Sequence, residues 1–539
     1  MKIRVRQLEL HRLEFEGTSL PGKIDLTLDG MNVGWSSEDG PAAGFLRVDH
    51  ARLGIPGLRP IGVTLGARFT LDDGVRIPVW TAAGDGIDLR GSGTLGAAPD
   101  TNLTGTGRID LATLDHIIRA HGLLEGEIDI EAVLEPGEAD LLRAEVRSEH
   151  LTVAGFPLDA VAGRLIFNGE SLRGELDRAT FHDGLVSGTY FLDAIRGKFP
   201  HRVRVNGRGV SVAGILDNLK IPPAGISSTI DADVELAWIG KGFKQGLGRA
   251  DARFIPGDGT LPAAGDLLVE LVPDGTLNFS AQNLQLGGSV LGWQGPLAIG
   301  TWQPAWSITA SPAVLEEIVP MVNTWIGSRA LPPASGRGRL QVTLSGPWQE
   351  LVVNTRLDAR PLRLDPVVLD HVVADGLIAG GRLTLAPSRF RIADGSGQIE
   401  GSMTWDPAVG DEQLNLELRG HRIPLATLAE WIGEEGMAEG LFSFTGGLRG
   451  RIGLPRGSWA AGLAGVAIAG LDLGNATATI NLEEGRFEAR GIDFDEGLQG
   501  RVWWQVADGE IGGDLGWNGM PLAFLGDTIT RTVAVSYTH

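Results

Sequence analysis

The sequence contains no cysteine and only two tyrosines among its 539 residues. Without cysteine, the chain can form neither disulfides nor thiolate metal sites, and it cannot use a cysteine nucleophile. It also lacks any apolar run of about 18 residues, so it predicts no transmembrane helix. The first ten residues alternate charged and apolar side chains and do not contain the apolar core of a signal peptide.

The chain has fewer basic than acidic residues. The chain has 46 Lys and Arg against 67 Asp and Glu, which gives a net charge of −21 and a pI near 4.9. Such a chain repels phosphate backbones, and no basic stripe interrupts the sequence. The charge therefore predicts that nucleic acid is not a partner.

Catalytic and cofactor motifs are also lacking. G-x-S-x-G, P-loop and H-E-x-x-H patterns do not occur, and Gly91–Gly96 matches G-x-G-x-x-G without a helix directly after it. The paired carboxylates Glu316 and Glu317 have no base or nucleophile motif nearby, so we interpret them as solvating a helix. The sequence thus predicts a protein that is not an enzyme and has no catalytic residue, metal site or cofactor.

The two most prominent features of the sequence are its high glycine content and its alternation of apolar and polar residues. The 79 glycines are about 15% of the chain, against a usual level of about 7%, while 43% of residues are apolar. A chain this apolar buries a large surface, so the glycines are best explained as turns, bulges and tight contacts between strands. Strict alternation of apolar and polar residues, which is typical of half-buried strands, occurs at 24–28, 234–236, 340–344 and 414–418.

Turn signals recur with a period near one hundred residues. The marker glycines Gly86, Gly184, Gly287, Gly395 and Gly497 are separated by 98, 103, 108 and 102 residues. From 25 to 30 residues after each of the first four, apolar residues at helical spacing predict short helices over 111–118, 212–219, 313–319 and 425–432. Two signals in phase indicate a repeated module of several strands and one amphipathic helix, whose core is completed by its neighbours.

These signals divide the chain into modules. We predict a partial β module at 1–85 and a truncated fifth module at 497–539, whose helix begins at Pro521 and whose tail from about residue 535 is not native. The four complete repeat modules are predicted at 86–183, 184–286, 287–394 and 395–496. Because the first and last modules are incomplete, we expect the chain to be a fragment of a longer protein.

Long arrays of alternating strands, Gly-rich turns and recurrent Leu-rich helices resemble the AsmA-like superfamily, particularly its TamB-type (translocation and assembly module) proteins. The phrases that carry this resemblance include 339–347, 361–364 and 380–385. The resemblance implies a mostly β, elongated sheet curled into a groove or tube that bridges the inner and outer membranes in the periplasm of a Gram-negative bacterium. It also implies an N-terminal inner-membrane anchor absent here, phospholipids as cargo, an outer-membrane β-barrel as a partner, and no catalytic residues.

The residues support a related mechanism independently. A sheet with one apolar face covers that face by closing, by adding a second layer or by holding a ligand, and the predicted helices are too few and short to cover it. An apolar trough would accept acyl chains at roughly 0.8 kcal/mol per buried methylene. The predicted trough residues are Leu26, Leu28, Val234, Leu236, Leu340, Val342, Leu344, Leu383, Leu385, Leu414, Leu416 and Leu418.

Other interpretations remain open at this point. The same residues could form an ordinary core. The groove could instead offer strand edges to unfolded outer-membrane β-barrel proteins, as a chaperone or assembly factor would. A β-solenoid adhesin would close its apolar face as a dry core, but the coil periods of about 20–30 residues expected for it are not found.

Overall fold

The fold is known from a computed structural model of the whole chain. It divides into two compact units, Met1–Phe279 and Ser280–His539, which we describe separately. The residues described are 7–13, 24–36, 42–54, 61–72, 74–84, 86–96, 101–118, 124–134, 142–153, 155–168, 171–193, 200–239, 245–326, 331–347, 350–365, 367–404, 413–431, 436, 438–452, 454–468, 471–495, 497–505 and 510–517.

The predicted fold class is confirmed. About 80% of the structure is strand, the sheet is antiparallel and does not close on itself among the described strands, and the helices are few and short. Alternating residues form these strands because the period of two places apolar side chains on one face and polar ones on the other.

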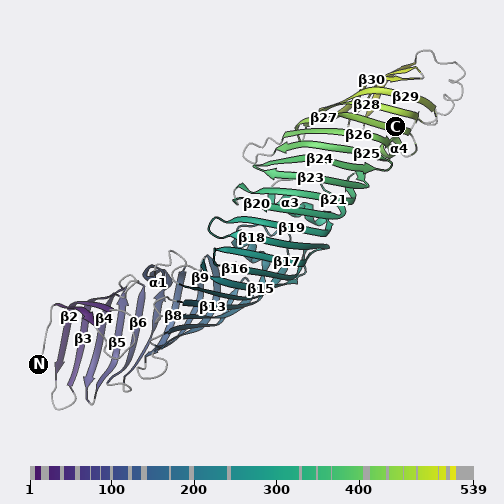
Figure 1. Cartoon of the computed structure of the whole chain (residues 1–539). Helices are drawn as coiled ribbons and strands as arrows, with labels where there is room; N and C mark the ends of the chain where they lie inside the picture. Colours follow the sequence, from purple (N-terminus) through teal and green to yellow (C-terminus); the bar gives the residue numbers. More distant parts are fainter. Residues whose placement is uncertain are drawn as a thin grey trace. The chain divides into compact units, whose positions relative to one another are not determined.

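The first unit is an antiparallel meander in which each strand pairs with the next one along the chain (Figure 1). Its strands are β1 (Gln7–Leu13), β2 (Ile24–Ser36), β3 (Ala42–Gly54), β4 (Ile61–Leu71), β5 (Val75–Gly84), β6 (Ile87–Leu95), β7 (Asn102–Asp110), β8 (Leu124–Leu134), β9 (Leu142–Val153), β10 (Phe156–Phe167), β11 (Ser171–Phe181), β12 (Gly184–Asp193), β13 (Pro200–Ser211), β14 (Ser228–Ile239), β15 (Leu247–Pro256) and β16 (Ala263–Val272).

The second unit repeats this meander, with the short β22 paired beside β21. Its strands are β18 (Ser289–Ala298), β19 (Gln303–Val314), β20 (Ser335–Ser345), β21 (Val352–Leu364), β22 (Val367–Leu369), β23 (His371–Ala379), β24 (Arg382–Ile392), β25 (Gly395–Thr404), β26 (Gln413–Pro424), β27 (Ala438–Arg451), β28 (Leu454–Ile468), β29 (Leu471–Glu483), β30 (Arg486–Phe494), β31 (Leu498–Gln505) and β32 (Ile511–Trp517). Strand β17 (Thr276–Leu286) begins in the first unit and ends in the second.

Among the described residues, four short helices interrupt the meanders where the sequence predicts them: α1 (Leu111–Ile118), α2 (Val212–Asn218), α3 (Leu315–Ile326) and α4 (Leu425–Trp431). Helix α3 begins two residues later than predicted, because Ala313 and Val314 still pair with β20. The expected fifth helix from Pro521 and the expected non-native tail lie outside the described residues.

The order of elements repeats along the chain. Six long strands lie between successive helices, such as β8–β13 between α1 and α2 and β14–β19 between α2 and α3. The third repeat adds only the three-residue β22. The module boundaries themselves remain predictions.

The marker glycines have a structural reason for their period. Gly86, Gly184, Gly287 and Gly395 each lie against the strand-to-helix junction that follows. A Cβ on Gly184 would approach the Val210 nitrogen to 2.6 Å, and one on Gly395 would approach the Ile423 Cα to 2.6 Å. The Gly86 carbonyl also accepts a 2.7 Å hydrogen bond from the Asp110 nitrogen, directly before α1. Only a residue without a side chain allows the turn to pack this closely.

A register shift recurs in the strand that leads into a helix. It lies between Gly207 and Val210 before α2, between Ala310 and Ala313 before α3, and between Gly420 and Ile423 before α4. Such shifts bend the end of a strand, and here the chain turns into a helix directly afterwards. Ser211 caps α2, since its hydroxyl oxygen accepts a 3.2 Å hydrogen bond from the Gly214 nitrogen.

The paired carboxylates of α3 do more than solvate the helix, so that interpretation was wrong. The Glu317 carboxylate accepts hydrogen bonds of 2.9 and 3.1 Å from the Gly288 nitrogen, in the turn that opens β18. The Glu316 carboxylate accepts one of 3.1 Å from the Gly336 nitrogen in β20. The two residues therefore tie α3 to the sheet on both sides.

Candidate binding face

Strand register in the second unit brings the predicted trough residues into shared rows. Residues that pair directly across antiparallel strands present their side chains on the same face. One row crosses six strands and contains Leu344, Val353, Ile378, Leu383, Met403 and Leu414. The next row contains Val342, Thr355, Gly376, Leu385, Gly401, Leu416 and Leu448. We call this side of the sheet the apolar face.

The two remaining predictions of this unit lie on the same face. Leu340 is opposite Ala310 and Leu357, and Leu418 is opposite Ile399. All eight predicted residues of the second unit are half-buried, whereas their polar sequence neighbours, such as Thr343 and Asn415, are exposed. The apolar face is therefore partly open to solvent over these rows.

The first unit has its own apolar face. Val234 is opposite Val205 and Ala250, and Leu236 is opposite Val203 and Gly248. Both predicted residues are half-buried.

Burial on this face is uneven. It deepens at β16, where Leu271 is 5% exposed. Leu28 is half-buried opposite Ala51, while the side chain of Leu26 lies outside the described part of the structure.

Burial also changes along single strands, from one end to the other. In β26, Leu414, Leu416 and Leu418 are half-buried, but Ile423 next to α4 is 2% exposed. In β13, Val203 and Val205 are half-buried, whereas Val210 next to α2 is 5% exposed.

Strand β19 does not show this simple gradient, because Pro304, at the end far from α3, is also fully buried. Ile308 is half-buried, and Ala313 next to α3 is completely buried. In β13 and β26, burial on the apolar face is thus deepest next to the helix, and the apolar residues farther along the strand are half-buried.

A cavity lies under α4, between the helix and the apolar face. Its volume is about 330 Å³, at the lower end of the range for small-molecule sites. Its lining is almost wholly apolar and comprises Leu362, Leu364, Val367, Leu369, Val372, Ala374, Leu385, Ser388, Arg389, Phe390, Ile392, Ile399, Ile423, Leu428, Trp431 and Phe444. Sequence reasoning missed this cavity, because helix and strand residues meet there only after folding.

Aromatic rings fill gaps that glycines leave on the apolar face. Trp80 in β5 lies over two neighbouring strands: a Cβ on Gly91 would be 2.6 Å from the ring, and one on Gly105 would be 2.7 Å from it. Trp459 in β28 lies against Gly446 in the same way, at 2.7 Å. The glycines therefore let large rings lie flat on the sheet, which keeps its apolar surface continuous.

The opposite face, which we call the polar face, carries ion pairs between adjacent strands. Arg108 contacts Asp129 at 3.2 Å, Arg204 contacts Glu235 at 3.1 Å, and Arg501 contacts Asp514 at 2.6 Å. All six side chains are more than half exposed. Such pairs stabilise little individually, but they keep this face hydrated and fix the register of neighbouring strands.

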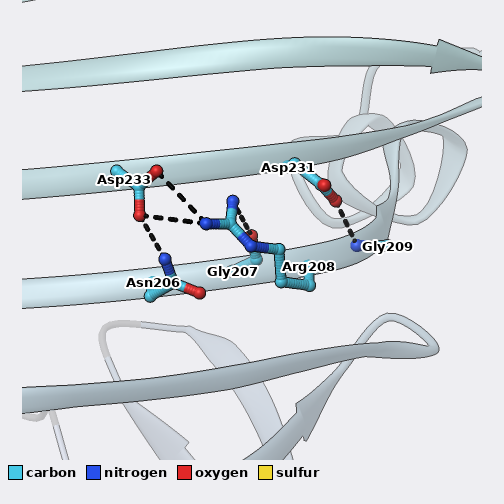
Figure 2. Close-up of polar contacts among 6 residues, drawn as sticks. All are labelled: Asn206, Gly207, Arg208, Gly209, Asp231 and Asp233. Carbon is cyan, nitrogen blue, oxygen red and sulfur yellow. Dashed lines mark hydrogen bonds and ion pairs between the residues drawn. The ribbon is translucent and has the colours of Figure 1, made fainter.

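Figure 2 shows how polar contacts hold the register shift before α2. The Gly209 nitrogen donates a 2.8 Å hydrogen bond to the Asp231 carboxylate across the strand pair. Arg208 lies 3.3 Å from the Asp233 carboxylate, which also accepts a hydrogen bond from the Asn206 side chain. Gly209 has a φ of +66°, which favours glycine there.

The pKa shifts on this face follow the ion pairs. A hydrogen bond from Arg249 lowers the pKa of Asp251, and one from Arg490 lowers the pKa of Glu488. Hydrogen bonds to Asp129 and Asp177 raise the pKa values of Arg108 and Arg164, respectively. These groups are therefore charged at neutral pH.

Within the described part of the chain, no group of three or more His, Asp or Glu side chains is arranged to hold a metal ion. None of the described helices has the length and apolar character to cross a membrane. No protein-family model matches the chain, and no curated protein does either.

Proposed function

We propose that the apolar face binds the acyl chains of phospholipids and conducts them between the inner and outer membranes of a Gram-negative bacterium, in support of outer-membrane biogenesis. The observation that carries this proposal is the set of apolar rows that cross β20, β21, β23, β24, β25 and β26, in which all eight predicted trough residues are half-buried and Met403 is buried. The resemblance of the sequence pattern to AsmA-like proteins supports the same function and a periplasmic location.

The chemistry of the rows suits acyl chains. Each methylene moved from water onto such a surface contributes roughly 0.8 kcal/mol, whatever the lipid species. The rows contain no charged side chain from Leu344 to Leu414 or from Val342 to Leu448, so no position traps a headgroup. A continuous surface without specific contacts allows a chain to slide along the stack of strands.

The test uses the chain expressed in a Gram-negative periplasm, followed by native mass spectrometry and lipid extraction. We expect several phospholipids to copurify. Val342→Asp and Leu416→Asp should reduce the bound lipid strongly, because each places a carboxylate in the middle of a row. The matched controls Thr343→Asp and Asn415→Asp change the adjacent residue on the polar face and should retain the lipid.

Three results would contradict the proposal. A folded chain without lipid would indicate a closed core or a protein-binding surface. Equal loss of lipid in the apolar-face and polar-face variants would mean that the rows are not the site. Saturable binding of unfolded outer-membrane β-barrel peptides without acyl-chain binding would favour an assembly factor instead.

A further inference from the structure

A cavity of about 940 Å³ lies over strands β23 to β28 of the second unit. Most of its lining residues belong to the polar face, and Phe390 and Phe444 also line the cavity under α4. Five of its lining residues are basic: His371, Arg389, Arg391, Arg419 and His421. No Asp or Glu occurs among the described residues that line it. We call it the cationic cavity, and it stands in a chain whose net charge is −21.

Strand register explains why these residues gather. His371 is opposite Arg391, which is opposite Ser396, which is opposite His421. Since neighbouring strands are about 4.8 Å apart, this row spans three strand spacings.

A second row lies directly beside the first. Arg389 is opposite Gln398, and Gln398 is opposite Arg419, which in turn is opposite Thr445. Two guanidinium groups therefore flank a neutral amide, with hydroxyl groups of Ser396 and Thr445 beside them.

The basic side chains are only partly neutralised. Arg389 and Arg391 form no ion pair with any residue that the structure describes. Arg419 lies 3.9 Å from Glu400 and 3.7 Å from Glu417, both long contacts. His371 is bound to Asp358 at 2.9 Å.

The first unit provides an internal contrast. A polar-face cavity of about 810 Å³ there is lined by three arginines, Arg90, Arg108 and Arg147, and by twice as many carboxylates. Those carboxylates are Asp88, Asp110, Glu127, Asp129, Glu131 and Glu145. Arg108 in that cavity is paired with both Glu127 and Asp129. A cavity on the polar face is therefore not always lined by an excess of basic residues. The cationic cavity has such an excess, whereas the cavity in the first unit has an excess of carboxylates.

We propose that the cationic cavity binds a phosphate ester. Arginine side chains match the oxygens of phosphate with two parallel hydrogen bonds, and Ser396, Gln398 and Thr445 add neutral donors. The volume lies in the range of small-molecule sites and leaves room for an organic group, against which Val373 and Ala460 present apolar surface. The phosphate can come from a soluble metabolite or from a lipid headgroup.

This binding does not depend on the acyl-chain function, because the rows of the trough lie on the other face of the sheet. Val342→Asp should therefore leave phosphate-ester binding unchanged. Conversely, replacing the arginines of the cationic cavity should leave copurified lipid unchanged if the lipid is held by its acyl chains.

The experiment is calorimetric titration of the full chain with sn-glycerol 3-phosphate, and with succinate to show whether any anion suffices. We expect the triple variant Arg389→Gln, Arg391→Gln, Arg419→Gln to bind the phosphate ester at least about tenfold more weakly, since charged hydrogen bonds are lost. The matched control is Arg339→Gln, Arg449→Gln, Arg456→Gln, which removes equal charge from exposed positions outside the cavity and should change affinity less than about twofold, a screened long-range effect. Circular dichroism and the thermal midpoint establish that each variant is folded.

A second titration identifies the source of the phosphate. Binding to phosphatidylglycerol vesicles without binding to glycerol phosphate, abolished in the first triple variant alone, would support a lipid headgroup. Binding of glycerol phosphate with the same variant dependence would support a soluble ester. The proposal would be overturned if the chain bound neither glycerol phosphate nor the vesicles. It would also be overturned if the two triple variants weakened binding equally, or if succinate bound with the same affinity as glycerol phosphate.

Discussion

The two ends of strand β26 differ in how the apolar face is covered. Near α4, Ile423 is 2% exposed and lines the cavity beneath the helix. Seven residues earlier, Leu416 lies on the same face, half-buried and without a helix above it. The same type of side chain therefore serves as core at one end and as available surface at the other.

The same difference occurs in β13, where Val210 next to α2 is buried and Val203 and Val205 are half-buried, and it indicates a division of labour along these two strands. The helix junction provides stability, since marker glycine, register shift and helix pack together there. Apart from Met403, the rows farther from the helix are packed less tightly, and under the proposed function they would hold the ligand.

The largest expected effect tests this division directly. Ile423→Ala should lower the free energy of unfolding by about 2–5 kcal/mol, since it removes buried methyl groups and enlarges a cavity. Leu416→Ala should cost only about 1–2 kcal/mol, because the side chain is already part-exposed. Urea unfolding of the second unit, followed by tryptophan fluorescence, measures both. Equal losses would mean that the uncovered rows are ordinary core.

A smaller effect is expected from the marker glycines. Gly395→Ala places a Cβ 2.6 Å from the Ile423 Cα and 2.8 Å from the Arg422 carbonyl oxygen, so backbone must move, and we expect a loss of about 1–3 kcal/mol. The control is Gly462→Ala, where no atom lies within 4 Å of the new Cβ. That substitution should be neutral or stabilise slightly, by up to about 1 kcal/mol, since alanine restricts the unfolded chain. Thermal unfolding compares the two, and a neutral Gly395→Ala would show that the junction is loosely packed.

The smallest effect concerns the polar face. The pKa of Asp251 lies below its usual value of 3.8 because Arg249 donates a hydrogen bond to its carboxylate. A lowered pKa contributes stability above the unfolded value, and this contribution is lost as the pH falls through the folded pKa. Arg249→Gln should therefore raise the pKa of Asp251 toward 3.8 and reduce stability slightly at neutral pH but not in strong acid.

Carbon NMR titration of the Asp251 carboxylate measures the first effect, and unfolding at two pH values measures the second. An unchanged pKa in the variant would show that the Arg249 contact does not persist in solution. The pair is exposed, so a large loss of stability would also contradict the assignment of this face to solvation.

Much of the architecture could be predicted from local patterns of apolar and polar residues in the sequence. Alternation in 340–344 and 414–418 determined which residues share a face, because a strand has a period of two. Helical spacing determined where α1, α2 and α4 begin, to the residue. The period of the marker glycines could be read from the sequence, although the packing that requires it could not.

Tertiary structure alone decided how much of the apolar face is covered and where charge accumulates. Ile423 lies seven residues after Leu416, so a period of two alone would place it on the opposite face. The register shift between Gly420 and Ile423 returns it to the apolar face, where it lines the cavity under α4. Arg389 and Arg419 lie 30 residues apart in the chain, and strand register alone places them on either side of Gln398, with only β25 between their strands. Pairing between strands is a long-range property, whereas periodicity is a local one, so the sequence by itself determined the faces and the fold determined the sites upon them.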